Sequence, residues 1–295
     1  MSLTALSLVS KFPSHVIRIL GCNPGVMTLQ GTNTYLLGTG QRRILIDSGD
    51  EETAPEYTKL LKNVLEEEKA TVEHLVITHW HHDHIGGVKA VKELVKSISN
   101  SFPTVWKLPR SLEDIADEPD YHCDGCQALA DDQLLEVDGA KLQVKHTPGH
   151  TTDHACLVLQ QNNSLFSGDC ILGETTAVFE DLSDYIKSLN KILNLNPKII
   201  YPGHGPVVDN PIPKIKYYIE HRNKRELQII EFLNHNRDRW LSNMDIVANL
   251  YKDTPKNLWP AAGVNVAHHL QKLLKENKVR LKNDKWQLVA IENKL

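Results

Sequence analysis

The sequence predicts an α/β domain over residues 1–210, followed by a small and mainly helical domain over residues 211–295. In the first part, short runs of β-branched and apolar residues alternate with segments of helical periodicity. Pro211-Ile212-Pro213 then marks a boundary, and longer helical segments follow it. A further observation is that histidines and aspartates come directly after several of the predicted strands. These features predict two domains, with the chemistry in the first.

The composition is that of an ordinary globular protein. Of the 295 residues, 41% are hydrophobic and 24% are charged, which supplies enough apolar material for a sizeable core. No apolar run approaches the length needed to cross a bilayer, so we expect no membrane partner. The formal net charge of −4 argues against general nucleic-acid affinity but permits a local basic groove.

The first domain is predicted to contain strands linked by glycine-rich turns and a few helices. Residues 21–31 are expected to form a loop, and Gly38-Thr39-Gly40 is expected to join two strands as a hairpin. Residues 99–135 have little periodicity and are expected to be mostly loop. The predicted strands are Val16–Leu20, Asn33–Leu37, Arg43–Ile46, Val72–Thr78, Thr104–Lys107, Ala140–His146, His154–Leu159, Ser164–Phe166 and Lys198–Tyr201, and the predicted helices are Pro55–Lys69, a segment beginning at Val88, and Asp184–Leu193.

The stretch Thr78–Gly87, which reads THWHHDHIGG, is the strongest signal in the chain. In an extended segment, residues two apart point the same way, so His79 and His81 can bind one ion. Asp83 and His84 lie at the turn into a helix and can face a second ion. Imidazole nitrogen with carboxylate oxygen suits zinc, with iron or manganese as alternatives. The stretch therefore predicts a metal site.

Three further residues follow predicted strands and sit beside glycines: His150, Asp169 and His204. Taken singly, each is most simply a turn residue. Because strand ends at one edge of a sheet converge, together with the first cluster they supply seven ligands. That number suffices for two adjacent metals with one bridging aspartate. Asp47, after another strand, is either a turn residue or a group that orients a metal-binding histidine.

The second domain is predicted to be of winged-helix type. Helical segments over Lys214–Asn234, Ser242–Tyr251 and Ala261–Asn277 precede two short strands that flank Asn283-Asp284, a hairpin turn signal. A nucleic-acid contact surface and a solvated face of a packing domain are both compatible with the basic end of the chain, and the second is favoured. Its basic residues are Lys272, Lys275, Lys278, Arg280, Lys282 and Lys285.

The five cysteines form an odd, scattered set that fits a reducing compartment better than a disulfide scaffold. His122 to Cys126 contains one C-x-x-C pair, Cys123 and Cys126, without a second pair of ligands nearby. We expect free thiols in a loop there. The first 20 residues have no acid and several serines, a weak likeness to an organelle transit peptide.

The motif H-x-H-x-D-H at 79–84, with His150, Asp169 and His204 downstream, resembles the metallo-β-lactamase superfamily. The resemblance implies an αββα sandwich with two zinc ions. It implies that His79, His81 and His150 bind one ion, that Asp83, His84 and His204 bind the other, and that Asp169 bridges them. Asp47 is implied to lie in the second layer around the metals.

Longer stretches, such as GCNPGVMTLQGTNTYLLGTG and FSGDCILGETTAVFEDL, resemble the endoribonucleases of that superfamily. The resemblance implies a zinc-dependent endoribonuclease that acts on single-stranded RNA in the mitochondrial matrix, with the cytosol as the alternative location. Hydroxide bridging the metals would attack the phosphodiester, and Asp83 would accept the proton of the attacking water. Trp80 and Phe179 are the aromatic residues suggested to stack on RNA bases, although a core position is favoured for either.

The same hydroxide can attack a carbonyl, so the rival hypothesis is a thioesterase of the glyoxalase II kind, or a lactam or lactone hydrolase. The sequence after Asp169, GDCILGETTAVFEDL, departs from the GDTLF pattern of glyoxalase II. A third hypothesis is a binding module with vestigial metals. Full occupancy of the seven ligand positions disfavours it.

Overall fold

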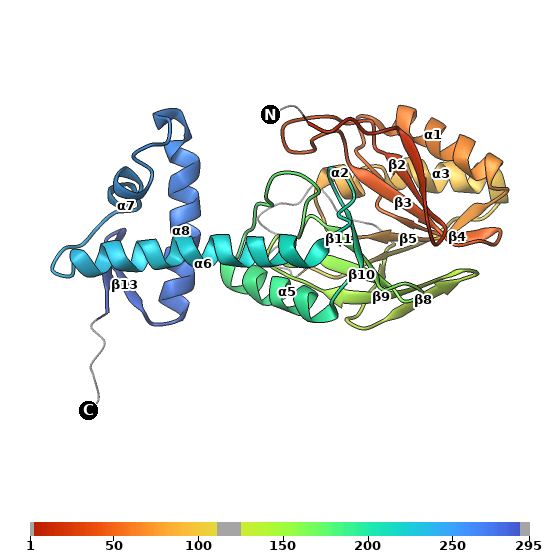
Figure 1. Ribbon diagram of the computed structural model, residues 1–295. Coiled ribbons are helices and arrows are strands. Elements are labelled where there is room, and N and C mark those ends of the chain that lie inside the picture. The colour runs from red at the N-terminus through yellow and green to blue at the C-terminus, as the bar shows by residue number, and fades with distance from the viewer. Residues whose placement is uncertain (1–2, 111–124, 290–295) are drawn as a thin grey trace.

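The computed structural model describes residues 3–110 and 125–289 and contains a two-sheet sandwich joined to a smaller helical part (Figure 1). In the sandwich, two sheets pack face to face and helices cover both outer faces. The predicted αββα arrangement is therefore confirmed, as is the winged helix that follows it.

The larger sheet has seven strands in the order β1-β2-β3-β4-β5-β6-β7. Strands β1 to β4 are antiparallel, whereas β4, β5, β6 and β7 run parallel to one another. The predicted hairpin through Gly38-Thr39-Gly40 is the β3–β4 pair. The strands are β1 (Val9–Phe12), β2 (Val16–Leu20), β3 (Asn33–Leu37), β4 (Arg42–Ile46), β5 (Thr71–Ile77), β6 (Thr104–Lys107) and β7 (Gln127–Ala128).

The smaller sheet has five strands in the order β12-β11-β10-β9-β8. Only the β11–β12 pair is parallel, because helix α5 (Leu182–Leu195) connects these two strands. The strands are β8 (Leu134–Val137), β9 (Ala140–His146), β10 (Ala155–Leu159), β11 (Ser164–Gly168) and β12 (Ile199–Pro202).

Three apolar clusters hold the layers together. The cluster between the sheets contains Tyr35, Phe166 and Tyr201, whose ring centroids lie 5.0–5.5 Å apart. Helices α1 (Ala54–Glu67) and α3 (Val88–Ser99) cover the outer face of the larger sheet. Helix α5 and the first half of α6 (Pro211–His235) cover the smaller sheet. Strands buried on both faces are therefore mostly apolar, as in the ACLVL sequence of β10.

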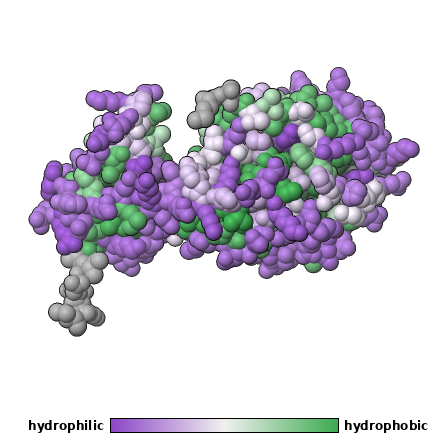
Figure 2. Space-filling model, in the orientation of Figure 1, coloured by the Kyte–Doolittle hydropathy of each residue, from purple (hydrophilic) through white to green (hydrophobic). Residues whose placement is uncertain are grey.

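The C-terminal part is built from α7 (Asn243–Leu250), a short 3-10 turn (Lys256–Leu258), α8 (Trp259–Lys275) and the wing β13 (Val279–Lys282) and β14 (Lys285–Leu288). Helix α6 extends from the sandwich into this part (Figure 1), and its buried residues divide accordingly. Tyr218 belongs to the core of the sandwich and Leu233 to the core of the winged helix. On the face shown in Figure 2, a notch separates the two parts above this helix.

Three strands differ from the sequence prediction. β1 was not predicted, and β7 and β8 lie in the segment 99–135 that was expected to be mostly loop. All three are edge or near-edge strands of two to four residues, too short to show an apolar alternation. Among the described residues, no helix is both long enough and apolar enough to cross a membrane.

Candidate metal centre

The seven predicted ligands come from four separate stretches of the chain and meet at one edge of the sandwich. His79 and His81 follow β5, and Asp83 and His84 lie in the short helix α2 (His82–Ile85). The other three follow strands of the smaller sheet: His150 lies in the turn after β9, Asp169 directly after β11, and His204 after β12. The sheets thus bring all seven side chains together, in overlapping groups that can each bind a metal ion.

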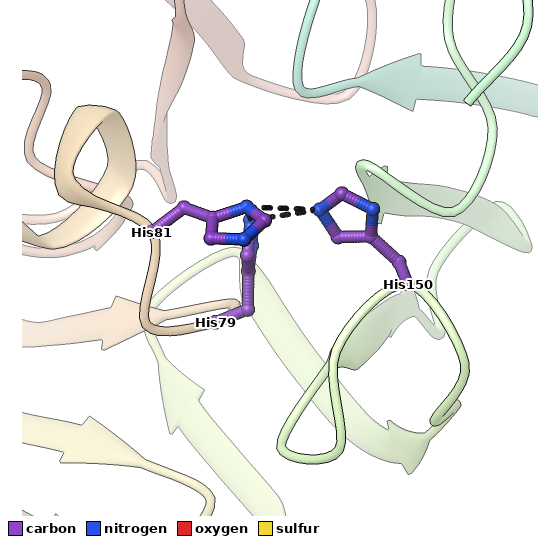
Figure 3. A group of neighbouring side chains, drawn as sticks. All are labelled: His79, His81 and His150. Carbon is purple, nitrogen blue, oxygen red and sulfur yellow. Dashed lines mark hydrogen bonds between the residues drawn. The ribbon is translucent and has the colours of Figure 1, made fainter. Parts of the chain in front are cut away.

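The first group is formed by three ring nitrogens that point toward one another (Figure 3). Nε2 of His79 lies 3.0 Å from Nδ1 of His81, and Nε2 of His150 lies 3.2 Å and 3.1 Å from these two atoms. Tetrahedral zinc with bonds of about 2.0–2.1 Å to each nitrogen would space them about 3.3 Å apart. The three nitrogens therefore fit a single metal ion.

The second group is formed by Asp83, His84 and His204. Oδ2 of Asp83 lies 3.2 Å from Nε2 of His84 and 3.2 Å from Nε2 of His204, and the two nitrogens are 3.4 Å apart. All three side chains are buried. One carboxylate and two imidazoles at these separations fit a second ion.

Asp169 lies between the two groups. Its Oδ2 is 3.2 Å from Nε2 of His204 and 3.7 Å from Nε2 of His150, and its Oδ1 is 3.4 Å from Nε2 of His84. Oδ1 is buried and forms no well-aligned hydrogen bond among the described residues, so a neighbouring cation, either the charged ring of His84 or a metal ion in its place, must balance it. This position suits a ligand shared by two ions.

The electrostatics of the two groups are opposite. Burial lowers the pKa of His81 to about 3 and also lowers the pKa values of His79 and His150. Burial also opposes charge on His84 and His204, but the carboxylates around them outweigh it. They raise the pKa of His84 well above its usual value and that of His204 to about 9. The first group is thus held in the neutral form that binds metals, whereas the second must release protons to do so.

Asp47 fixes the orientation of His84. Its Oδ2 lies 2.8 Å from Nδ1 of His84, and its two oxygens accept hydrogen bonds from the backbone N–H and the hydroxyl of Thr78. His150 is fixed in the same manner, since its Nδ1 donates to the carbonyl of Val178 at 2.8 Å. In both histidines Nε2 is left facing the centre. Such outer partners set the tautomer and the basicity of a metal-binding imidazole.

Comparison with known proteins agrees with this geometry. Residues 27–204 match the family described as the metallo-beta-lactamase superfamily, and residues 242–286 match the beta-lactamase associated winged helix domain. This chain belongs to the metallo-β-lactamase superfamily. A beta-lactamase-like protein 2 homolog from Drosophila melanogaster is 53% identical, with 92% of each chain covered.

Two other comparisons bear on this member of the superfamily. An atrochrysone carboxyl ACP thioesterase from Aspergillus fumigatus is 39% identical, with 78% of this chain and 68% of that protein covered. The structure of a beta-lactamase domain protein from Burkholderia ambifaria superimposes with a TM-score of 0.78 at 17% identity, covering 95% and 93% of the two chains. The latter shows the fold, which here includes the C-terminal part.

Two residues near the candidate metal centre had no predicted role. His154 is fully buried, and its Nε2 accepts a hydrogen bond from the backbone N–H of Asp169 at 3.1 Å. The hydroxyl of Thr32 donates to Oδ2 of Asp83 at 2.8 Å. The role of His154 could have been inferred from the sequence, because the stretch H-T-T-D-H places it four residues after the ligand His150. Thr32 lies within the stretch of residues 21–40 that resembles the family, but its residue type gave no signal of this contact.

The suggestion that Trp80 and Phe179 stack on RNA bases is wrong for the structure described, because both are only 8% exposed. The guanidinium of Arg110 lies 4.2 Å from the ring centroid of Trp80. Phe179 stacks on Tyr185 and is also covered by Arg222. Neither ring presents a free face.

The basic residues at the end of the chain are largely engaged within the molecule. Lys272 pairs with Glu226 and Glu276, and Lys275 pairs with Asp181. Arg280 donates to Gln287. These contacts favour the packing interpretation over a continuous basic surface.

The cysteine prediction needs one correction. Cys126 is disulfide-bonded, so the expected free thiol at this position is wrong, while His122 and Cys123 lie outside the described residues. Cys22, Cys156 and Cys170 have free thiols.

A pocket of about 830 Å³ opens above the centre, with His81, Asp83, His150, Asp169 and His204 among the residues that line it. Part of its rim is aliphatic: Val26 is 94% exposed, Met27 65% and Val178 54%. Its other charged residues are acids, Asp50 and Glu52, and no lysine or arginine lines it within the described part of the chain. The metal centre is therefore accessible to a substrate of moderate size.

Proposed function

We propose that this metallo-β-lactamase superfamily hydrolase binds two zinc ions and cleaves phosphodiester bonds of single-stranded RNA. The observation that supports hydrolysis is the position of Asp169 between two groups of convergent ligands on the floor of an open pocket. The choice of RNA rests on the sequence resemblance to endoribonucleases of the family.

The residues fit the metals. His79, His81 and His150 would hold one ion, Asp83, His84 and His204 the other, and Asp169 both. Two zinc ions so held would make water acidic near neutral pH and offset the negative charge that develops on a phosphoryl group.

The protein's own contribution is orientation and proton transfer. Asp83 faces the pocket, and although burial opposes its charge, His84 and His204 hold the pKa of its carboxyl well below the usual value. Its carboxylate is therefore ionised in the metal-free protein. We assign it the role of accepting the proton of the attacking water because it faces the pocket, while the hydroxyl of Thr32 holds Oδ2 in place. Because water and not the ribose 2′-hydroxyl attacks, the expected products have 5′-phosphate and 3′-hydroxyl ends.

A second candidate is hydrolysis of an acyl thioester. It is supported by the thioesterase among the relatives and by the aliphatic rim formed by Val26, Met27 and Val178. A pocket without lysine or arginine among its described lining residues suits an uncharged acyl group better than a polyanion. RNA would have to reach the centre with its phosphates contacting cations outside this pocket.

One experiment separates the two. Purified protein is incubated with labelled single-stranded RNA, S-lactoylglutathione and a long-chain acyl thioester, each with and without a chelator. Chelator-sensitive cleavage of RNA to 5′-phosphate ends, lost in His150→Ala and Asp169→Ala but kept in the distant control His235→Ala, is the result expected. Products with 2′,3′-cyclic phosphate ends, or thioester hydrolysis without RNA cleavage, would overturn the proposal.

The salt dependence gives a further criterion. Contacts to phosphates release counterions, so RNA cleavage at subsaturating substrate should fall steeply between about 50 and 200 mM salt. The mitochondrial matrix is proposed as the location on the same resemblance. Fractionation of cells that express the full chain would test it.

A further inference from the structure

The segment 173–181, hereafter the wall loop, forms one side of the pocket and also contacts a metal ligand. Thr175, Thr176, Ala177 and Val178 line the pocket. The carbonyl of Val178 accepts the hydrogen bond from Nδ1 of His150. The position of the wall loop therefore affects both the shape of the pocket and the orientation of His150.

The wall loop also holds the turn that contains His150 through its backbone. The N–H groups of Glu180 and Asp181 donate to the carbonyl of Gly149, at 2.8 Å and 3.1 Å. At the other end of the loop, the N–H of Gly173 donates to the carbonyl of His204 at 2.8 Å. The loop thus connects ligands of both metal groups.

Helix α6 binds the opposite side of this loop with three side chains spaced four residues apart. Nζ of Lys214 donates to the backbone carbonyl of Gly173 at 2.6 Å. The hydroxyl of Tyr218 donates to the backbone carbonyl of Thr175 at 3.0 Å. The guanidinium of Arg222 donates to the carbonyl of Ala177 at 3.1 Å.

The three side chains lie on one face of α6, because residues four apart in a helix are neighbours on its surface. They bond to the carbonyls of residues 173, 175 and 177 in turn, so α6 follows the wall loop over this length. Tyr218 and Arg222 are both buried, so these hydrogen bonds are shielded from water.

The winged-helix part completes the contact. The ring of Phe179 lies between Tyr185 of α5 and His268 of α8, with centroid distances of 5.1 Å and 5.2 Å. The guanidinium of Arg222 lies 5.0 Å from the same ring. Asp181, two residues after Phe179, forms an ion pair with Lys275 of α8. The C-terminal part therefore touches the wall loop only a few residues from the bond to His150.

We propose that Lys214, Tyr218 and Arg222 are positioning residues, through which helix α6 fixes the wall loop and with it the ligand His150. Helix α8 supports the same loop through His268 and Lys275. The inference rests on the metal centre of the proposed function, and it assigns α6 a role in shaping the active site.

The test uses the full chain and variants of the α6 side chains. Arg222→Met removes the bond to Ala177, Arg222→Lys retains a single donor, and Tyr218→Phe removes only a hydroxyl. Lys216→Met, an exposed residue on the same helix, is the matched control. Hydrogen exchange of the wall loop and the absorption spectrum of the cobalt-substituted protein are measured for each.

In Arg222→Met we expect exchange of the Gly173, Glu180 and Asp181 amides to accelerate, a changed cobalt spectrum, and roughly 10-fold weaker binding of one ion. Arg222→Lys should recover part of each, and Tyr218→Phe should show smaller changes in the same direction with the fold intact. Lys216→Met should match the wild type.

Suppose that the wild type binds two ions, but that wall-loop exchange and the cobalt spectrum are unchanged in both Arg222→Met and Tyr218→Phe. That result would overturn this inference and leave the proposed function standing. A wild type that binds no metal would instead overturn the proposed function. Hydrogen exchange would still show in that case whether α6 holds the loop.

Discussion

The carboxylate of Asp47 lies 2.8 Å from the ring of His84, with both side chains buried. The bond is made by Nδ1, so Nε2 of the same ring faces Asp83 and Asp169. Because Asp47 also accepts two bonds from Thr78, its own carboxylate cannot rotate freely. The pair therefore fixes which nitrogen of His84 is offered to a metal.

Asp47→Asn should weaken metal binding without unfolding the protein. The backbone of Asp47 is left-handed, with φ of 61°, a conformation that asparagine tolerates well. The substitution thus removes the charge on the acceptor while sparing the backbone. We expect zinc affinity to fall about 10- to 100-fold, measured by competition with a chromophoric chelator.

Asp50→Asn supplies the control, since Asp50 is a nearby acid that lines the pocket without contacting the seven ligands in any hydrogen bond or ion pair described above. Its zinc affinity should stay near that of the wild type. Equal losses in both variants would mean that only the overall negative charge of the pocket matters.

Asp169→Asn should affect both ions, whereas His81→Ala should affect one. Asp169 faces both groups of ligands, while the nitrogen of His81 approaches only His79 and His150. Elemental analysis of protein dialysed against limiting zinc is expected to give about one ion per chain for His81→Ala and less for Asp169→Asn. Retention of two ions by Asp169→Asn would contradict a shared ligand.

The sequence predicted that the seven side chains would converge, because five of them follow strands and the other two begin the helix after β5. His150, Asp169 and His204 are distant in sequence, but the ends of neighbouring strands must lie at one edge of the sandwich. The helical pattern after Pro211 and the turn at Asn283-Asp284 likewise depend on local signals. Local patterns thus indicated most elements, whereas the sandwich arrangement was implied by the family resemblance.

The residues that support the centre were harder to predict because their partners are not local. Arg222 is a charged residue on a mostly polar helix, and nothing near it in sequence indicates that it reaches Ala177. Phe179 was suggested as a possible stacking platform, although a core position was favoured, and the core position is the one observed: Tyr185, Arg222 and His268 cover the ring. Contacts between domains depend on tertiary packing, which periodicity does not encode.

The metal-free protein should lose stability as the pH rises above about 6.5. The pKa of His204 is about 9 in the folded chain because, although burial opposes it, Asp169 and Asp83 favour the charged ring. A pKa that is higher in the folded chain stabilises the fold fully at a pH below 6.5, the pKa in the unfolded chain. This stabilisation is lost as the pH rises to about 9, the pKa in the folded chain. The expected loss is on the order of 3 kcal/mol, measured by urea unfolding in chelator.

The zinc-loaded protein supplies the contrast. A metal at Nε2 of His204 replaces the proton, so metal affinity should rise over the same range of pH. Stability of the loaded protein should then hold or increase where that of the metal-free protein falls. Parallel curves for the two forms would show that His204 does not exchange a proton for a metal.

Gly149→Ala should destabilise the protein far more than Gly49→Ala. Gly149 has φ of 128°, which non-glycine residues avoid, and a Cβ there would lie 2.3 Å from the backbone nitrogen of Tyr185. Gly49 also has a positive φ, of 75°, but its Cβ would meet only ordinary contacts at 3.6 Å. Strain alone costs roughly 1–2 kcal/mol, whereas a clash with backbone adds about 1–3 kcal/mol. Because Gly149 precedes His150, the Gly149→Ala variant should also bind one zinc ion less tightly, and urea unfolding with zinc titration would measure both effects. Equal destabilisation of the two variants would show that Tyr185 moves aside, and that the turn at Gly149 is held by backbone conformation and not by packing against α5.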